Sequence, residues 1–242
     1  MTERDPSDPQ QIAAMAADPD LRRAADDFVL LGCRYRYPYN FSWLGVPVIQ
    51  FPQDLIALQQ IVWQVRPDLV VETGVAHGGG SIFLASMLAL LGGDGRVIAI
   101  DVDIRANNRR TIEAHPLSGR IDLLEGSSTD DAIVARVRER AARKRVMLVL
   151  DSNHTHAHVL AELRAYAPLV RRGSYAVVLD TIIERMTPEE IGDRPWAPGN
   201  SPMSAVREFL AESDRFEIDG RLEDTLMISV APGGYLRCIK DP

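Results

Sequence analysis

Two acidic side chains follow apolar segments in the second half of the chain. Asp151 comes directly after Val146–Leu150, and Asp180 directly after Tyr175–Leu179. Because neighbouring parallel strands end at one edge of a sheet, Asp151 and Asp180 can converge on one cleft. Two facing carboxylates repel each other unless a cation, a proton or a basic group lies between them, and hard oxygen ligands favour Mg²⁺ or a similar ion. The alternative is two aspartates that cap helices or close turns.

Three histidines follow within a short segment. His154 is a candidate general base, because an imidazole pKa can lie near neutral pH. His158 lies one helical turn further along and is a candidate substrate-binding residue, with packing on a helix face as the alternative. His156 is expected to point away from the site. A zinc cluster is disfavoured, because this spacing at a helix start separates the rings.

A glycine-rich turn follows an earlier apolar segment. Glycines let the backbone approach a ligand closely and adopt dihedral angles that other residues avoid. The spacing here is E-x-G-x-x-x-G. It differs from the G-x-G-x-x-G of dinucleotide sites and favours S-adenosylmethionine as the ligand, with an ordinary strand-to-helix turn as the alternative. The candidate cofactor-binding residues are Glu72, Gly74, Ala76, His77, Gly78 and Ser81.

Two further strand ends extend this candidate cofactor site. Asp101 ends the second predicted strand, where a carboxylate can accept hydrogen bonds from both ribose hydroxyls of a nucleoside; capping of the next helix is the alternative. Ser127 and Ser128 follow the third strand and are candidates for contact with the adenine edge. Asp151 is assigned to the cofactor site as well as to the metal site.

The apolar segments alternate with segments of helical periodicity. Strands are predicted over Leu69–Glu72, Val97–Ile100, Ile121–Leu124, Val146–Leu150 and Tyr175–Leu179. Helices are predicted over Asp54–Val65, Ser81–Leu91, Arg105–His115, Asp130–Arg143, His156–Val170 and Pro202–Ser213. This alternation predicts an α/β, Rossmann-like fold, with a mostly parallel seven-stranded sheet and helices on both faces. A closing strand pair is expected over Phe216–Ile218 and Thr225–Val230.

Two segments lie outside the alternation. Residues 1–10 are expected to form a flexible tail, Gln11–Leu31 a helix, and the aromatic stretch that follows a cover over the core, with a subunit contact or a pocket wall as alternatives. Residues 184–201 lack periodicity, and so long a loop inside a compact domain predicts a lid. Arg194 and Trp196 in this loop are candidate substrate-binding residues; a surface ion pair is the alternative for Arg194.

Composition narrows the functional class. The net charge is −7 and no basic stripe is present, which disfavours a nucleic-acid partner. No apolar run is long enough to span a membrane and the N-terminus lacks an apolar signal core, so a cytoplasmic protein is predicted. Cys33 and Cys238 are far apart and are expected to be reduced thiols. The aromatic N-terminal segment favours a homo-oligomer.

Together these motifs resemble the cephalosporin hydroxylase / rhamnosyl O-methyltransferase family, which has the class I methyltransferase fold. The resemblance runs from about Trp43 to Phe209. It rests on the segments Trp43-Leu44-Gly45-Val46-Pro47, Arg66-Pro67-Asp68-Leu69-Val70-Val71-Glu72-Thr73-Gly74, Ala76-His77-Gly78-Gly79, Asp101-Val102-Asp103-Ile104-Arg105, Gly126-Ser127-Ser128, Asp151-Ser152-Asn153-His154-Thr155-His156 and Arg194-Pro195-Trp196-Ala197-Pro198-Gly199-Asn200. The chain then divides into an N-terminal tail, helix and cover segment, residues 1–50, and a methyltransferase domain, residues 51–242.

The resemblance implies S-adenosylmethionine as cofactor, a divalent cation held by Asp151 and Asp180, and methyl transfer to a sugar hydroxyl of the rhamnose type, free, nucleotide-linked or attached to a natural product. His154 occupies the place of the lysine base of the similar catechol O-methyltransferases. The chain departs from the family at residues 179–181, which are Leu-Asp-Thr where the family is expected to have Glu-Asp-Thr. One carboxylate is therefore missing, and Glu184 is the candidate substitute.

Three other functions stay open at this stage. The methyl acceptor can be a phenol or a β-lactam instead of a sugar. An NAD-dependent oxidoreductase is permitted by Asp101 but disfavoured by the glycine spacing. A non-catalytic accessory protein that binds the cofactor is favoured by the missing carboxylate, whereas the set Asp151, His154 and Asp180 favours catalysis.

Overall fold

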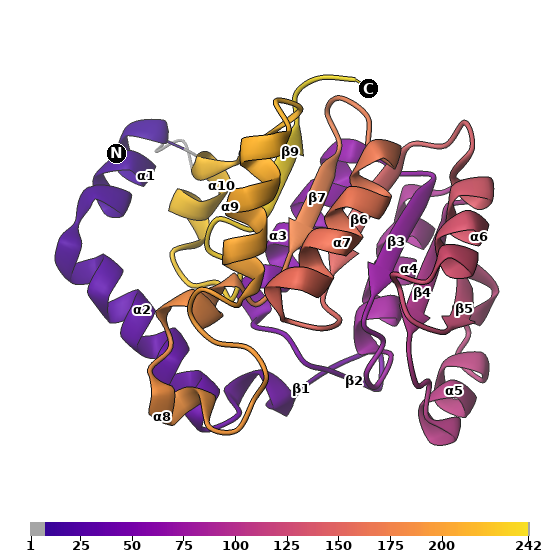
Figure 1. Cartoon of the computed structure of the whole chain (residues 1–242), viewed down its shortest axis with the longest axis horizontal. Coiled ribbons are helices and arrows are strands. Elements are labelled where there is room, and N and C mark those ends of the chain that lie inside the picture. Colours follow the sequence, from indigo (N-terminus) through magenta and orange to yellow (C-terminus); the bar gives the residue numbers. More distant parts are fainter. Residues whose placement is uncertain (1–7, 242) are drawn as a thin grey trace, which may run out of the picture.

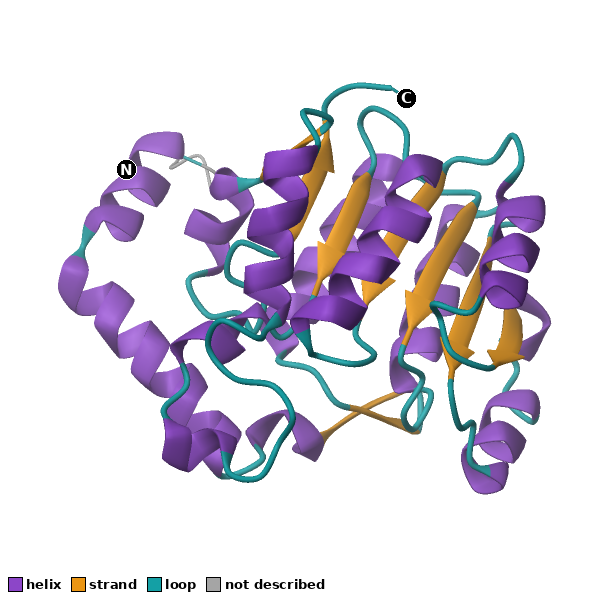
Figure 2. Ribbon diagram, in the orientation of Figure 1, coloured by secondary structure: helices purple, strands orange, loops and turns teal. Residues whose placement is uncertain are grey.

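The computed structural model describes residues 8–241 and confirms the predicted α/β fold. Seven strands form one sheet in the order β5-β4-β3-β6-β7-β9-β8, with helices on both faces (Figures 1 and 2). The strands are β3 (Leu69–Thr73), β4 (Arg96–Asp101), β5 (Ile121–Glu125), β6 (Val146–Leu150), β7 (Tyr175–Val178), β8 (Phe216–Ile218) and β9 (Tyr235–Cys238). The predicted tail lies outside the described residues up to residue 7, and a helix already begins at Pro9.

The order of the strands places a crevice at the centre of the sheet. β3 pairs in parallel with β4 on one side and with β6 on the other, and β4 and β6 continue outward in parallel to β5 and β7. The chain thus moves outward from β3 to β5 before it returns to β6. In such sheets ligands bind where the strand order reverses, beyond the carboxyl ends of the strands. β9 runs antiparallel to both of its neighbours.

Alternating side chains of the strands feed two separate cores. Val70, Val97 and Val149 face one side, and Val71, Ile98 and Leu148 face the other. Strands buried on both faces are expected to be apolar throughout, as these are. The first core is covered mainly by α3 (Pro52–Val65) and α4 (Gly79–Leu91), and the second by α6 (Asp131–Ala141), α7 (His156–Tyr166) and α9 (Pro202–Glu212). A further helix, α5 (Ala106–Glu113), lies between β4 and β5 in the sequence.

The predicted strand over Thr225–Val230 is wrong. Asp219 caps α10 (Gly220–Leu226) by accepting a hydrogen bond from the Leu222 amide, and Met227 ends this helix with a φ of 58°. The strand that pairs with Phe216–Ile218 is β9 instead. Val230 is buried although it lies outside any strand. Its amide donates a hydrogen bond to the buried carboxylate of Asp54 on α3.

The N-terminal region holds two helices where one was expected. α1 (Pro9–Ala17) and α2 (Pro19–Arg34) are separated at Asp18, whose side chain caps α2. After the short 3₁₀-helix η1 (Tyr37–Asn40), β1 (Phe41–Trp43) and β2 (Val46–Val48) form an antiparallel hairpin. Trp43 packs edge-to-face on Phe83 of α4, with ring centroids 4.9 Å apart. The aromatic stretch therefore covers the core, as predicted.

The predicted lid loop has local structure. It begins after β7 with η4 (Thr181–Arg185), continues through α8 (Pro188–Ile191), and lies with the hairpin near the carboxyl ends of the parallel strands (Figures 1 and 2). Thr187 and Glu190 cap α8 reciprocally. None of the helices within the described part of the chain is both long and apolar enough to cross a bilayer.

Candidate active site

A cleft of about 1190 Å³ opens beyond the carboxyl ends of the parallel strands. Eleven of the predicted site residues line it: Gly74, Ala76, Asp101, Ser127, Ser128, Asp151, His154, His158, Asp180, Arg194 and Trp196. They come from the ends of five strands, from α7 and from the lid loop, so the structure joins residues far apart in the sequence. The other four candidates, Glu72, His77, Gly78 and Ser81, do not line this cleft.

The glycine turn brings its backbone against β6. Gly74 has a φ of +89°, and a side chain there would place its Cβ atom 2.0 Å from the carbonyl oxygen of Asp151. Only glycine permits this approach, because any Cβ atom would collide with fixed backbone. Ala76 also has a positive φ, 46°, and lines the cleft. The turn thus packs closely against the end of β6 and places two small residues in the wall of the cleft.

The other four predicted cofactor residues lie in or next to this turn but outside the cleft. Ser81 is buried and donates a hydrogen bond to the buried carboxylate of Glu72. Burial raises the pKa of Glu72 to about 8; the Ser81 hydrogen bond opposes the rise, and the charge of Asp101 adds to it. Glu72 and His77 border a second, small cavity of about 40 Å³. A Cβ atom on Gly78 would lie 2.5 Å from the Ile112 side chain, so this glycine permits close packing.

Asp101 ties the end of β4 to the glycine turn. Its Oδ2 atom accepts from the amides of Val75 at 2.8 Å and Ala76 at 3.3 Å, and its Oδ1 atom accepts from the Asp103 amide at 3.1 Å. The alternative role as a helix cap is wrong, because α5 begins at Ala106 and Asp101 does not bond to it. The carboxylate still lines the cleft and retains acceptor capacity for ribose hydroxyls.

Ser128 and His158 meet at the same end of the cleft. The Nε2 atom of His158 lies 3.0 Å from the Oγ atom of Ser128, which donates to Glu162 at 2.5 Å. Ser127 lies beside them and contacts Thr129 between hydroxyl oxygens at 3.0 Å. His158 is therefore grouped with the candidate adenine-binding serines, not with Asp151.

Asp151, His154 and Asp180 form a cluster at the other end of the cleft. One potential ligand atom from each lies within 4.8 Å of the others, and Nε2 of His154 is 3.4 Å from Oδ2 of Asp180. Burial, followed by the charge of Asp180, raises the pKa of Asp151 well above its usual range. Asp180 has a left-handed backbone with a φ of 55°, which aspartate tolerates better than most residues. Two carboxylates and an imidazole so arranged fit a divalent cation.

Glu184 does not substitute for the missing carboxylate. Its Oε2 atom accepts from the Gly199 amide and the Ser201 hydroxyl, and its Oε1 atom pairs with Arg207 at 2.8 Å. Glu184 therefore fixes the lid loop to α9. Leu179, at the position of the expected carboxylate, is 2% exposed and packs in the core. In this chain the third side chain of the cluster is His154, whose imidazole is placed to act either as a metal ligand or as the general base.

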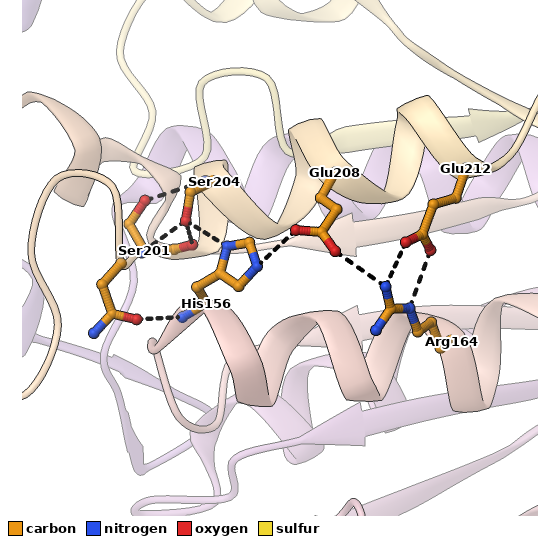
Figure 3. Close-up of polar contacts among 7 residues, drawn as sticks. His156, Arg164, Ser201, Ser204, Glu208 and Glu212 are labelled. Atoms are coloured by element: carbon orange, nitrogen blue, oxygen red, sulfur yellow. Dashed lines mark hydrogen bonds and ion pairs between the residues drawn. The ribbon is translucent and has the colours of Figure 1, made fainter.

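His156 points away from the cleft, as predicted. Its Nδ1 atom lies 2.9 Å from the Ser204 hydroxyl and its Nε2 atom 3.1 Å from Glu208, both on α9 (Figure 3). Glu208 also pairs with Arg164 further along α7. His156 thus joins α7 to α9 and serves as a natural comparison for the two histidines that line the cleft.

The lid loop reaches the acidic cluster through Trp196. The Trp196 ring packs edge-to-face on His154, with centroids 6.0 Å apart, and the guanidinium of Arg194 lies 5.0 Å from the centroid of the Trp196 ring. Arg194 also donates to the backbone carbonyls of Glu190 at 2.8 Å and Ile191 at 3.1 Å. The ion-pair alternative for Arg194 finds no support among the described contacts, since its partners are carbonyls and a ring.

The sequence interpretation missed the wall that the N-terminal region contributes. Arg34, Arg36, Tyr39 and Gln50 all line the cleft. Gln50 donates to Oδ2 of Asp151 at 2.9 Å and is 8% exposed. The pocket-wall alternative for the aromatic stretch indicated this contribution, but no periodicity singled out the four residues. The stretch therefore both covers the core and lines the site.

Comparison with known proteins agrees with this geometry. Seven strands with one antiparallel member, and a cleft at the switch point, define the class I methyltransferase fold. The family model Rhamnosyl O-methyltransferase/CmcI matches residues 35–239, and the chain belongs to this family. It is similar to the rhamnosyl O-methyltransferase of Mycobacterium tuberculosis, with 26% identity over 200 residues, 81% of this chain and 77% of that protein.

Other relatives extend the comparison. The rhamnosyl O-methyltransferase of Mycobacterium leprae is 26% identical over 202 residues, which cover 81% of this chain and 82% of that protein. Among solved structures, CmcI-D160 with Mg and S-adenosylmethionine has a TM-score of 0.56 at 21% identity and covers 83% of this chain and 77% of that one. An O-methyltransferase from Bacillus cereus in complex with SAH has a TM-score of 0.52 at 17% identity and covers 86% and 87%. These structures confirm the fold.

Proposed function

We propose that this protein is an S-adenosylmethionine-dependent O-methyltransferase that acts on a hydroxyl of a rhamnose-type sugar. The observation that carries the proposal is the cluster of Asp151, His154 and Asp180, which lines the same cleft as the glycine turn. A methyl donor held on the turn and an acceptor held at the cluster share this cleft. Membership of the rhamnosyl O-methyltransferase/CmcI family supports the same activity.

The residues at the turn bind and orient the cofactor. Gly74 and Ala76 present bare backbone, and Asp101 offers its remaining acceptor capacity to the ribose hydroxyls. When bound, S-adenosylmethionine supplies the methyl group, which moves from its sulfonium to the acceptor oxygen in an SN2 step. The protein provides position and electrostatics, which lower the barrier by holding the reacting atoms in line.

The acidic cluster activates the acceptor hydroxyl. Asp151 and Asp180 would hold a Mg²⁺ or similar ion, and such an ion lowers the pKa of an oxygen bound to it. His154 takes the hydroxyl proton as the methyl group is transferred. Trp196 packs on His154 and closes this end of the cleft against water.

The chemistry of the acceptor end favours a sugar that carries a phosphate group. Arg34, Arg36 and Arg194 line the cleft, and guanidinium groups recognise phosphate oxygens by charge and by paired hydrogen bonds. Tyr39 and Trp196 add aromatic surface for the apolar face of a deoxysugar. We therefore propose a nucleotide-linked rhamnose as the acceptor, in a natural-product pathway. Within the protein, Arg34 pairs with Glu190 at 3.5 Å and Arg194 packs on Trp196. A phenolic or β-lactam acceptor without a phosphate would make no further use of their charge.

We also propose that the protein pairs with a second copy through α2. Leu21, Phe28, Leu31 and Tyr35 are 42%, 42%, 48% and 81% exposed, and with Ala24 they recur at the spacing of a coiled-coil seam. In an antiparallel pair centred between Asp27 and Phe28, the small Ala24 faces the larger Leu31. These two side chains are therefore complementary in size.

Light scattering of the full chain tests this pairing. The double variant Phe28→Glu/Leu31→Glu should be a smaller assembly than the wild type, because charges would enter the seam. Leu90→Glu, on the 76%-exposed side chain at the far end of α4, is the matched control and should not change the mass. A wild-type monomer would contradict the pairing.

Mass spectrometry of methyl transfer tests the enzymatic function. The protein is incubated with S-adenosylmethionine and nucleotide-activated rhamnose, with Mg²⁺ or with EDTA. The proposal expects a methylated sugar that disappears with EDTA. A product that persists with EDTA removes the cation from the mechanism. Cofactor binding without any product favours the non-catalytic accessory function that the missing carboxylate at Leu179 permits.

A further inference from the structure

Glu162 organises three side chains that line the cleft. It lies on α7, is 0% exposed, and its Oε1 atom accepts from the hydroxyls of Ser128 at 2.5 Å and Ser152 at 2.6 Å. The Nε2 atom of His158 lies 3.4 Å from the same oxygen. These three residues come from the segments after β5 and β6 and from α7 itself. One buried carboxylate thus sets the orientation of three polar groups.

These contacts determine which nitrogen of His158 carries a proton. A serine hydroxyl has one proton, and that of Ser128 is donated to Glu162. The contact of 3.0 Å between Ser128 Oγ and His158 Nε2 therefore requires Nε2 to be the donor. The two oxygens near Nε2, Oγ of Ser128 and Oε1 of Glu162, then both act as acceptors toward it. In the neutral ring this leaves Nδ1 as an acceptor, and no contact among the described residues engages it.

His158 lines the nucleoside end of the cleft. Ser128 follows β5, next to the β4 end where Asp101 and Val102 also line the cleft. A nucleoside whose ribose lies at Asp101 extends its base toward the ends of β4 and β5. The base then reaches Ser128 and the His158 ring. This placement rests on the proposed function, because it requires the cofactor to be an adenosyl compound.

We propose that His158 is the residue that recognises the 6-amino group of the adenine base. Its Nδ1 atom accepts a hydrogen bond from that amino group, and Glu162 is a positioning residue that holds the ring in the accepting tautomer. A 6-oxopurine is rejected, because its keto oxygen would face the lone pair of Nδ1. The structure thus assigns His158 to cofactor selectivity and not to the methyl acceptor.

Titration calorimetry with two nucleosides tests this assignment. S-adenosylhomocysteine carries the 6-amino group, and S-inosylhomocysteine carries a keto oxygen in its place. The wild type should bind the adenosyl compound roughly 10- to 100-fold more tightly, the range expected when one buried hydrogen bond is replaced by an unpaired acceptor. His158→Phe, which keeps the ring shape, should reduce this ratio to nearly one, because it removes both the hydrogen bond to the adenosyl compound and the lone pair that faces the keto oxygen.

Two further variants separate recognition from folding. Glu162→Gln keeps the shape of the positioning residue, but its amide can donate as well as accept, so the ratio should fall only part of the way. His156→Phe changes the histidine on the same helix that faces α9, and its ratio should equal that of the wild type. If His158→Phe is poorly folded, the intermediate ratio of Glu162→Gln still tests the tautomer argument.

Three results would overturn the inference. An unchanged ratio in both His158→Phe and Glu162→Gln would exclude His158 as the reader of the base. A wild type that prefers the inosyl compound would show that Nδ1 donates, as in an imidazolium. A wild type that binds neither compound would contradict the proposed cofactor itself, and this result is distinct from binding with an unchanged ratio.

Discussion

The two ends of the cleft differ in how far their polar groups are already satisfied. At the nucleoside end the Asp101 carboxylate accepts from three backbone amides, and Ser128 and His158 are held by Glu162. At the acceptor end, Asp151 and Asp180 face each other with Gln50 and His154 as their polar neighbours.

This difference shows which end is complete without a ligand. Groups that already hold their hydrogen bonds keep their positions in the free protein, so the nucleoside end is preorganised. At the acceptor end burial, followed by the charge of Asp180, raises the pKa of Asp151, and a cation or a proton stabilises the two close carboxylates. We therefore expect changes at the acceptor end to affect turnover, and changes at the nucleoside end to affect affinity for the cofactor.

The largest effect is expected from His154→Ala. Loss of a general base lowers turnover by roughly 10²- to 10⁴-fold, while affinity for S-adenosylhomocysteine stays within a few fold. The control is His156→Ala, two residues away and directed to α9, which should keep wild-type turnover. Steady-state kinetics with calorimetry of Mg²⁺ also distinguishes the two roles open to His154. Weaker Mg²⁺ binding would make it a metal ligand, and unchanged turnover would exclude both roles.

Asp180→Asn should have the next largest effect. The amide oxygen remains a weak ligand, but the charge that holds the cation is lost, so turnover should fall by roughly 10²- to 10³-fold. Turnover should recover in part at high Mg²⁺, because the defect lies in occupancy of the site. The measurement is the Mg²⁺ dependence of the methyl-transfer rate in both proteins. A rate that is reduced equally at every Mg²⁺ concentration would contradict the assignment of Asp180 as a ligand.

The sequence predicted the sheet, and the convergence of its strand ends on one cleft, because both depend on local patterns. Apolar runs that end in Asp151 or Asp180 mark the strands and the cleft together. It failed where partners distant in the chain decide the structure. Thr225–Val230 has a strand-like composition, yet the cap at Asp219 and the bonds to Asp54 place it in a helix and a loop.

The same limit explains the errors in the site. Glu184 stands close to Asp180 in sequence, but Arg207 and Ser201 from α9 bind its carboxylate. The role of Gln50 depends on a contact with a residue about one hundred positions later, and no local pattern encodes such a contact. For His158 the sequence predicts a substrate-binding role, and the contact with Ser128, which the sequence does not reveal, is the basis of our proposal that it recognises the adenine base.

Glu72→Gln should change stability by an amount that depends on pH. Burial raises the pKa of Glu72 from 4.5 to about 8 in the folded protein, so the folded state binds more protons than the unfolded state between these values. The stability of the wild type therefore falls as the pH rises through this window. The variant lacks this contribution. Relative to the wild type it should gain roughly 4 kcal/mol between pH 5 and pH 9, since about three pKa units separate pH 5 from the folded pKa and one unit corresponds to about 1.4 kcal/mol.

Urea denaturation of both proteins at these pH values measures the difference and cancels the contributions of Asp54 and Asp151, which the two proteins share. A difference that does not change with pH would contradict a buried, protonated Glu72. A parallel loss of affinity for S-adenosylhomocysteine would show that Glu72 contacts the cofactor directly, although it lies behind the glycine turn.

The smallest effect is expected from removal of the cation on binding of S-adenosylhomocysteine. EDTA should abolish turnover but change this affinity by less than about threefold. The reason is that Gly74, Asp101 and Ser128 are held by bonds within the protein and need no cation to take up their positions. Asp151 is the one residue assigned to both ends of the cleft. Any change in affinity for S-adenosylhomocysteine on removal of the cation should therefore act through Asp151. Calorimetry with and without EDTA measures it, and a tenfold or larger loss of affinity would show that the two ends are coupled through Asp151 and that the nucleoside end is not preorganised.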